Sequence, residues 1–203
     1  MPGAGKTVLS SSIITRLDKS GTSIVLYFFF DFSEGKKRVL HGLLSSLIVQ
    51  LYSQLPQSQK YLDSLFATKG QNGAQQPSME DLTTTLNSML SIINGKAQII
   101  IDALDECSTR KELLLWIEQL SSLGLENLSL LVTSRDELDI ERGLARWLQE
   151  KHFISIQANN TDPDIQVYVH NALRTYPEFQ RWEKRPDVLE KMETELMKRA
   201  DGM

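Results

Sequence analysis

Residues 2–13 read PGAGKTVLSSSI, and this stretch decides how the rest of the chain is interpreted. Its beginning matches the end of the phosphate-binding loop pattern G-x-x-x-x-G-K-[ST], in which backbone N–H groups at a helix N-terminus surround phosphate oxygens. Gly3 and Gly5 allow a tight turn. Lys6 would neutralise the β- and γ-phosphates, and Thr7 would bind Mg²⁺ through its hydroxyl. The alternative is a glycine-rich turn that only caps a helix.

Strands and helices alternate along the chain. Continuous apolar runs predict buried strands at residues 24–30, 99–102, 128–133 and, more weakly, 153–156. Helical spacing of apolar residues predicts helices at 7–17, 38–55, 81–93, 109–124, 161–176 and 187–200. The alternation predicts an α/β fold with a doubly wound, mostly parallel sheet. We expect residues 1–158 to form this core and residues 159–203 to form a helical segment.

An acidic motif follows the third predicted helix. Asp102 ends a buried strand, where a carboxylate can hold Mg²⁺ opposite the phosphate loop. Asp105 and Glu106 follow closely, and either is a candidate general base that polarises the attacking water. The alternative is a strand followed by an acidic helix N-terminus. The phosphate loop earlier in the chain favours the metal site.

Polar residues also end the next predicted strand. Thr133, Ser134 and Arg135 lie at its carboxyl end, the edge of an open α/β sheet where ligands bind. Arg135 is a candidate sensor of the γ-phosphate that would stabilise charge in the transition state. Alternatively, it pairs with Asp136 or Glu137 at the surface.

Composition restricts the partners and the compartment. The 203 residues include 22 basic and 26 acidic side chains, a formal net charge of −4 that gives no general case for nucleic-acid binding. The longest apolar run, residues 24–30, is too short to span a bilayer. Cys107 is the only cysteine, which excludes an intrachain disulfide and fits a reducing compartment. We therefore expect a cytoplasmic protein without a membrane span.

The motifs together resemble those of the NACHT family of P-loop NTPases, and most closely the nephrocystin-type domains of large fungal signalling proteins. The resemblance rests on PGAGKTVLSSSII, VLYFFFDFS, AQIIIDALDEC, LLVTSRDE and DIQVYV. It implies that Thr7 and Asp102 hold Mg²⁺, that Arg135 is the sensor, and that Asp105 and Glu106 form the acidic pair after the metal-binding acid. It also implies that the nucleotide is bound by Gly3, Ala4, Gly5, Lys6, Thr7 and Val8.

The resemblance implies a regulatory switch of the STAND type, in which an ADP-like state is closed and exchange for ATP permits self-association. ATP is favoured over GTP. Many related ATPases carry a catalytic glutamate directly after the metal-binding acid, whereas this chain has Ala103 there, so we expect slow hydrolysis at most. Ankyrin or WD repeats are expected elsewhere in the longer protein. A small-molecule phosphotransferase and a nucleotide-free remnant or interaction module are the alternatives.

Both ends of the chain are predicted to be truncated. The first glycine of the loop pattern would precede the first residue, and the resemblance places a missing first strand beside the strand that ends at Thr133. Each unpaired buried backbone group would cost about 1–3 kcal/mol. The last residues resemble the start of a segment that leads into a winged-helix region. We therefore expect nucleotide binding by the complete gene product and weak or absent binding by these 203 residues alone.

Overall fold

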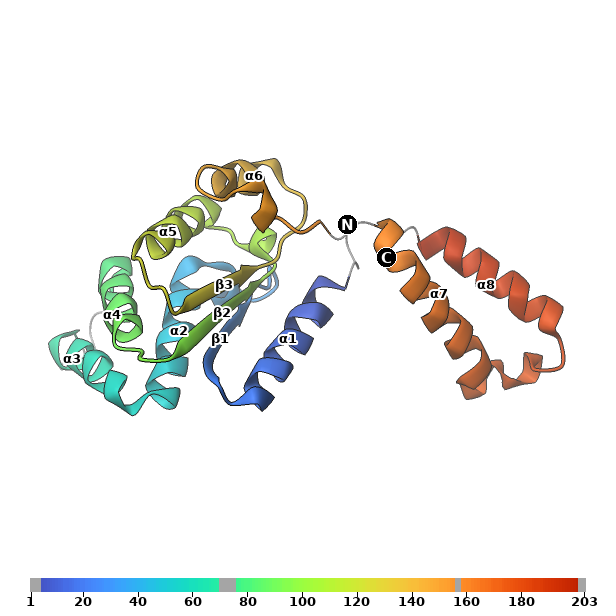
Figure 1. Cartoon of the computed structure of the whole chain (residues 1–203), viewed down its shortest axis with the longest axis horizontal. Helices are drawn as coiled ribbons and strands as arrows, with labels where there is room; N and C mark the ends of the chain where they lie inside the picture. Colours follow the sequence, from blue (N-terminus) through green and yellow to red (C-terminus); the bar gives the residue numbers. More distant parts are fainter. Residues whose placement is uncertain (1–4, 70–75, 156–157, 201–203) are drawn as a thin grey trace. The chain divides into compact units, whose positions relative to one another are not determined.

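The computed structural model describes residues 5–69, 76–155 and 158–200 (Figure 1). The chain divides into two compact units, one formed by Lys6–Leu148 and the other including Gln149–Met203. The unit Lys6–Leu148 contains the sheet and, of the residues that the sequence predicts to bind nucleotide or metal, Lys6, Thr7, Val8 and Asp102.

The sheet of the first unit has three parallel strands in the order β1-β2-β3. The strands are β1 (Ser23–Phe29), β2 (Lys96–Asp102) and β3 (Leu128–Val132). Phe29 lies opposite Asp102, so the carboxyl ends of the strands meet at one edge. The predicted α/β class with a parallel sheet is confirmed.

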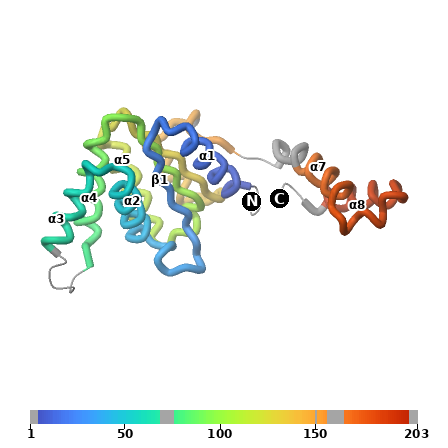
Figure 2. The backbone as a smooth tube through the Cα atoms, turned by 90° about the horizontal axis from the view of Figure 1, so that it is seen from below, coloured from blue at the N-terminus to red at the C-terminus, as the bar shows by residue number. Residues whose placement is uncertain are grey.

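Helices cover both faces of this sheet, as the doubly wound prediction requires (Figures 1 and 2). One face carries α1 (Lys6–Ser20), which contacts β1 and β2. The helices on the other face are α2 (Leu40–Gln54), α4 (Met79–Ser91) and α5 (Arg110–Ser122), and α3 (Gln59–Lys69) packs on α2 and α4.

Side chains along each strand point alternately to the two faces of the sheet, and this places the apolar core on one face. Leu26, Phe28, Ile99 and Ile101 are buried in one apolar cluster with residues of α2, α4 and α5. The intervening residues point to the face that carries α1. Asp102 belongs to this second set, so its carboxylate lies on the α1 side of the sheet.

The second unit is a helical hairpin. It contains α7 (Ala158–Thr175), a short 3₁₀ segment at Pro177–Trp182 and α8 (Pro186–Ala200). His170 and Arg174 of α7 both contact Glu193 of α8, at 3.2 and 3.4 Å.

Three features before residue 156 differ from the sequence-based expectations: the predicted fourth strand, α3 and α6. The predicted strand at 153–156 is wrong, because Phe153–Ser155 form no strand and Ile156 lies outside the described residues. The run FISI has the local pattern of a strand, but a strand also requires a ladder partner, which local pattern cannot supply. The sequence analysis also predicted no helix at α3 (Gln59–Lys69) or at α6 (Leu138–Ala145).

No helix in the described part of the chain is long and apolar enough to cross a membrane.

Candidate functional site

Asp102 is the centre of a hydrogen-bonded group at the carboxyl edge of the sheet. Its side chain is only 2% exposed. Thr7, in the first turn of α1, donates from Oγ1 to Asp102 Oδ2 at 2.6 Å. This bond joins the phosphate-loop motif to the acidic motif, 95 residues apart in sequence. The two residues predicted to hold Mg²⁺ are therefore side by side.

The other oxygen of the same carboxylate accepts two more hydroxyl groups. Ser10 donates to Asp102 Oδ1 at 2.8 Å, and Thr133, directly after β3, donates to the same atom at 2.6 Å. Thr133 Oγ1 also accepts from the backbone N–H of Ala103 at 3.1 Å. The carboxylate is thus held by α1 on one side and by the end of β3 on the other.

The start of α1 contains the remaining predicted phosphate-binding residues. Gly5 has φ +72°, a conformation that glycine adopts without steric cost, and α1 begins at Lys6. Val8 is 71% exposed on the first turn. Gly3 and Ala4, also predicted to bind nucleotide, lie outside the described residues.

A sharp turn follows Asp102. Ala103 has φ 60°, a left-handed conformation that is unusual for a residue other than glycine. Leu104 N then donates to Thr133 O at 2.9 Å, and a 3₁₀ turn spans Leu104–Glu106. The turn directs Asp105 and Glu106 away from the strand while keeping them at the same edge of the sheet.

Arg135 forms an ion pair with Asp105, a partner that the sequence did not suggest. Its Nε is 3.2 Å from Asp105 Oδ2, and its backbone N–H donates to Asp105 Oδ1 at 2.9 Å. The side chain of Asp105 is only 8% exposed, whereas that of Arg135 is 46% exposed. Arg110 of α5 donates to the backbone oxygen of Asp105 at 2.8 Å. The proposed sensor and one of the two proposed bases therefore form an ion pair in this structure.

Glu106 contacts the loop that follows β1. Its Oε2 accepts from Phe32 N at 3.2 Å.

The neighbouring Cys107 is 3% exposed, and burial raises the pKa of its thiol above the ordinary value. The thiol is therefore neutral near pH 7, and we assign it no part in the site.

Sequence reasoning missed Ser10. The helical period offered a signal, because residues i and i+3 share a face and Ser10 follows Thr7 by three positions. Across Lys6–Ser20, every residue of which is described, Ser10 is the one buried residue.

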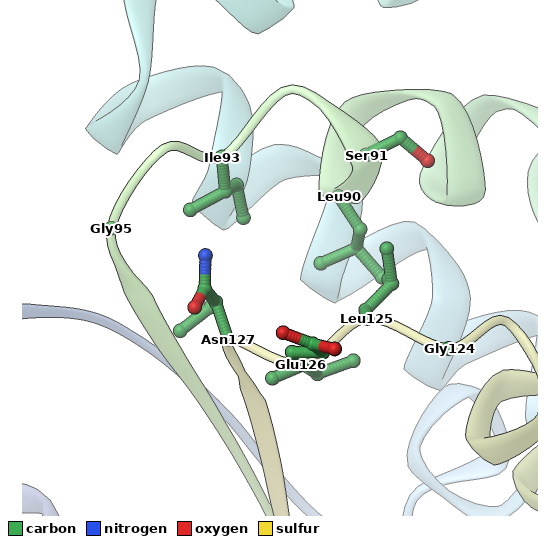
Figure 3. Close-up of a pocket in the computed structure, with 10 residues that line it drawn as sticks. Leu90, Ser91, Ile93, Gly95, Gly124, Leu125, Glu126 and Asn127 are labelled. Carbon is green, nitrogen blue, oxygen red and sulfur yellow. The ribbon is translucent and has the colours of Figure 1, made fainter.

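A small cavity of about 190 Å³ lies at the opposite edge of the sheet (Figure 3). Its lining comes from the end of α4 and from the segments before β2 and β3, and includes Leu90, Ile93, Glu126 and Asn127. In open α/β sheets ligands bind at the carboxyl ends of the strands, which is the edge of Asp102 and not of this cavity.

The motifs and their geometry agree with a comparison to known families. Residues 1–135 match the family described as "Nephrocystin 3, N-terminal", about two thirds of the chain. The chain belongs to this family. The resemblance to nephrocystin-type domains is thus confirmed.

One curated relative adds a second line of comparison. This nephrocystin 3 N-terminal family member is 27% identical over 176 residues to the vegetative incompatibility protein HET-E-1 of Podospora anserina. The match covers 85% of this chain but only 13% of that protein. No solved structure matches the chain significantly.

Proposed function

We propose that the chain is the nucleotide-binding switch module of a NACHT-type signalling protein, with ATP and ADP favoured over GTP. The observation that carries the proposal is the 2.6 Å hydrogen bond from Thr7 Oγ1 to Asp102 Oδ2. It brings together the two side chains that a magnesium–nucleotide site requires on its metal side. Family membership and the similarity to HET-E-1 support the signalling role.

The donor set fits a magnesium ion. Mg²⁺ prefers oxygen ligands and keeps several of its waters. Thr7 donates its hydroxyl proton to Asp102, which leaves lone pairs on its Oγ1 for a cation. In the proposed site Thr7 and Asp102 hold Mg²⁺, Lys6 binds the terminal phosphates, and the first turn of α1 presents its N–H groups to them. The bound cation would neutralise negative charge on the phosphates.

We propose slow hydrolysis, because the candidate bases are engaged elsewhere. The Asp105 carboxylate contacts Arg135, and Glu106 accepts from the backbone of Phe32. Ala103 stands directly after Asp102 and has no carboxylate. A site of this kind suits a switch that retains its nucleotide better than a catalyst with fast turnover. Arg135 would reach a phosphate only after leaving Asp105.

For the longer protein we propose self-association and further domains such as ankyrin or WD repeats. The lone Cys107 fits the cytoplasm, where thiols stay reduced.

The sequence alone predicts weak or absent binding by these 203 residues, but the contact between Thr7 and Asp102 leads us to propose binding by this chain itself. Mg-ADP should then raise the melting temperature of the chain, and Lys6→Ala should remove the rise. A ligand that binds only the folded state adds about 2.7 kcal/mol at about 100 times its Kd. Melting curves with and without Mg-ADP measure the effect. The matched control is Lys19→Ala, the same change in the last turn of the same helix, and it should keep the rise.

Two results would contradict the proposal. A wild-type melting temperature that does not change in saturating Mg-ADP or Mg-ATP would favour the nucleotide-free alternative. An equal rise in Lys6→Ala and wild type would place the ligand away from α1.

A further inference from the structure

Ser10 has no role in the phosphate-loop pattern, yet it is the most buried side chain of α1. It is 0% exposed, whereas Val8 and Leu9 beside it are 71% and 45% exposed. A helix that packs on a sheet normally buries apolar residues. Burying a hydroxyl instead is favourable only where it finds a good partner. The partner of Ser10 is the carboxylate of Asp102, at 2.8 Å.

The position of that bond on the carboxylate matters. Ser10 and Thr133 both donate to Oδ1, while Thr7 alone donates to Oδ2. The terminal torsion of an aspartate is broad, so the chain itself does not fix the direction of the two oxygens. Two donors that approach Oδ1 from α1 and from the end of β3 fix it. Oδ2 is then turned toward Thr7.

We propose that Ser10 is a positioning residue that, together with Thr133, holds Asp102 Oδ1 so that Oδ2 and the Thr7 hydroxyl are preorganised for Mg²⁺. This inference rests on the proposed function and names a residue that sets the Mg²⁺ affinity of the same site. Thr133 Oγ1 also accepts a hydrogen bond from Ala103 N. The residue that holds Asp102 Oδ1 therefore also contacts the turn that leads to Asp105.

The test is a magnesium titration of Ser10→Ala in the full chain, with a fluorescent ADP analogue as the probe. Loss of an outer partner of a metal ligand typically lowers metal affinity by about 10–100-fold. We expect the Mg²⁺ midpoint of Ser10→Ala to rise by about tenfold or more, with the Kd for the analogue in EDTA unchanged. A purely structural role would weaken both measurements together.

Ser12→Ala is the matched control. It removes the same hydroxyl two positions along the same helix, where the side chain is exposed and donates only to Val8 O of its own helix at 2.8 Å. Its Mg²⁺ midpoint should equal that of the wild type. Thr133→Val and Thr133→Ser form a second pair, in which the valine should raise the midpoint and the serine should restore it. This pair decides the question if Ser10→Ala does not melt cooperatively.

Two outcomes would overturn the assignment while leaving the proposed function intact. In one, Ser10→Ala titrates with Mg²⁺ like Ser12→Ala. In the other, binding in EDTA falls in parallel with binding in Mg²⁺. A wild-type chain that binds the analogue in neither condition overturns the proposed function, and this assignment with it.

Discussion

Asp102→Asn is expected to weaken Mg²⁺ binding strongly in the presence of ADP while leaving the fold intact. The amide oxygen can replace Oδ1 and accept from Ser10 and Thr133, and the amide nitrogen can donate to Thr7 Oγ1. The hydrogen bonds survive, but the negative charge and the second acceptor oxygen do not. We expect the Mg²⁺ affinity measured with ADP present to fall by about 100-fold. Removing a hydrogen-bond partner of a metal ligand typically lowers metal affinity by about 10–100-fold, and here the ligand itself is changed.

A magnesium titration at fixed ADP measures this effect. Asp136→Asn is the matched control, because it changes the net charge equally at an exposed carboxylate shortly after the neighbouring strand β3. It should titrate like the wild type. If Asp102→Asn kept the wild-type midpoint, Asp102 would not be the metal-binding acid.

Gly42→Ala is expected to lower the free energy of unfolding more than other glycine substitutions in this unit. An ideal Cβ at Gly42 would lie 1.8 Å from the backbone oxygen of Lys36, in the loop between β1 and α2. That loop has little freedom to yield, because Arg38 O accepts from Ser108 N at 2.7 Å and Lys37 O accepts from Asp31 N at 3.0 Å.

Helix propensity acts in the opposite direction, since alanine is favoured over glycine by up to about 1 kcal/mol inside a helix. Overpacking typically costs about 1–3 kcal/mol and sometimes more, and here the obstacle is backbone. We expect a net loss of about 2 kcal/mol, measured by urea unfolding. Gly143→Ala in α6 is the control, because its Cβ would meet only the end of the Leu114 side chain, at 2.8 Å. Equal stability of the two variants would show that the loop moves freely.

The strands and most helices followed from local pattern alone. The apolar runs that end at Phe29, Asp102 and Val132 are too continuous for a half-exposed strand, and the structure pairs them in parallel. Placing Thr7 beside Asp102 needed one further rule, that ligands bind at the carboxyl edge of such sheets. These inferences use only the chain's own periodicity and general topology.

The partners of single side chains could not be predicted in this way. Arg135 has acidic neighbours in sequence at Asp136 and Glu137, yet it pairs with Asp105, 30 residues away. That choice depends on the turn at Ala103, which no local signal marked. The donors on Asp102 Oδ1 likewise come from α1 and from the end of β3, so they are set by tertiary packing.

The most direct test of the central claim is hydrogen exchange of the full chain with and without Mg-ADP, read by mass spectrometry. The account predicts slower exchange at residues 6–12 and 102–107, the first turns of α1 and the turn after β2. It predicts no change around the cavity at the opposite edge of the sheet, at residues 90–97 and 124–128. Protection at that cavity with none at residues 6–12 and 102–107 would contradict the assignment of the nucleotide site.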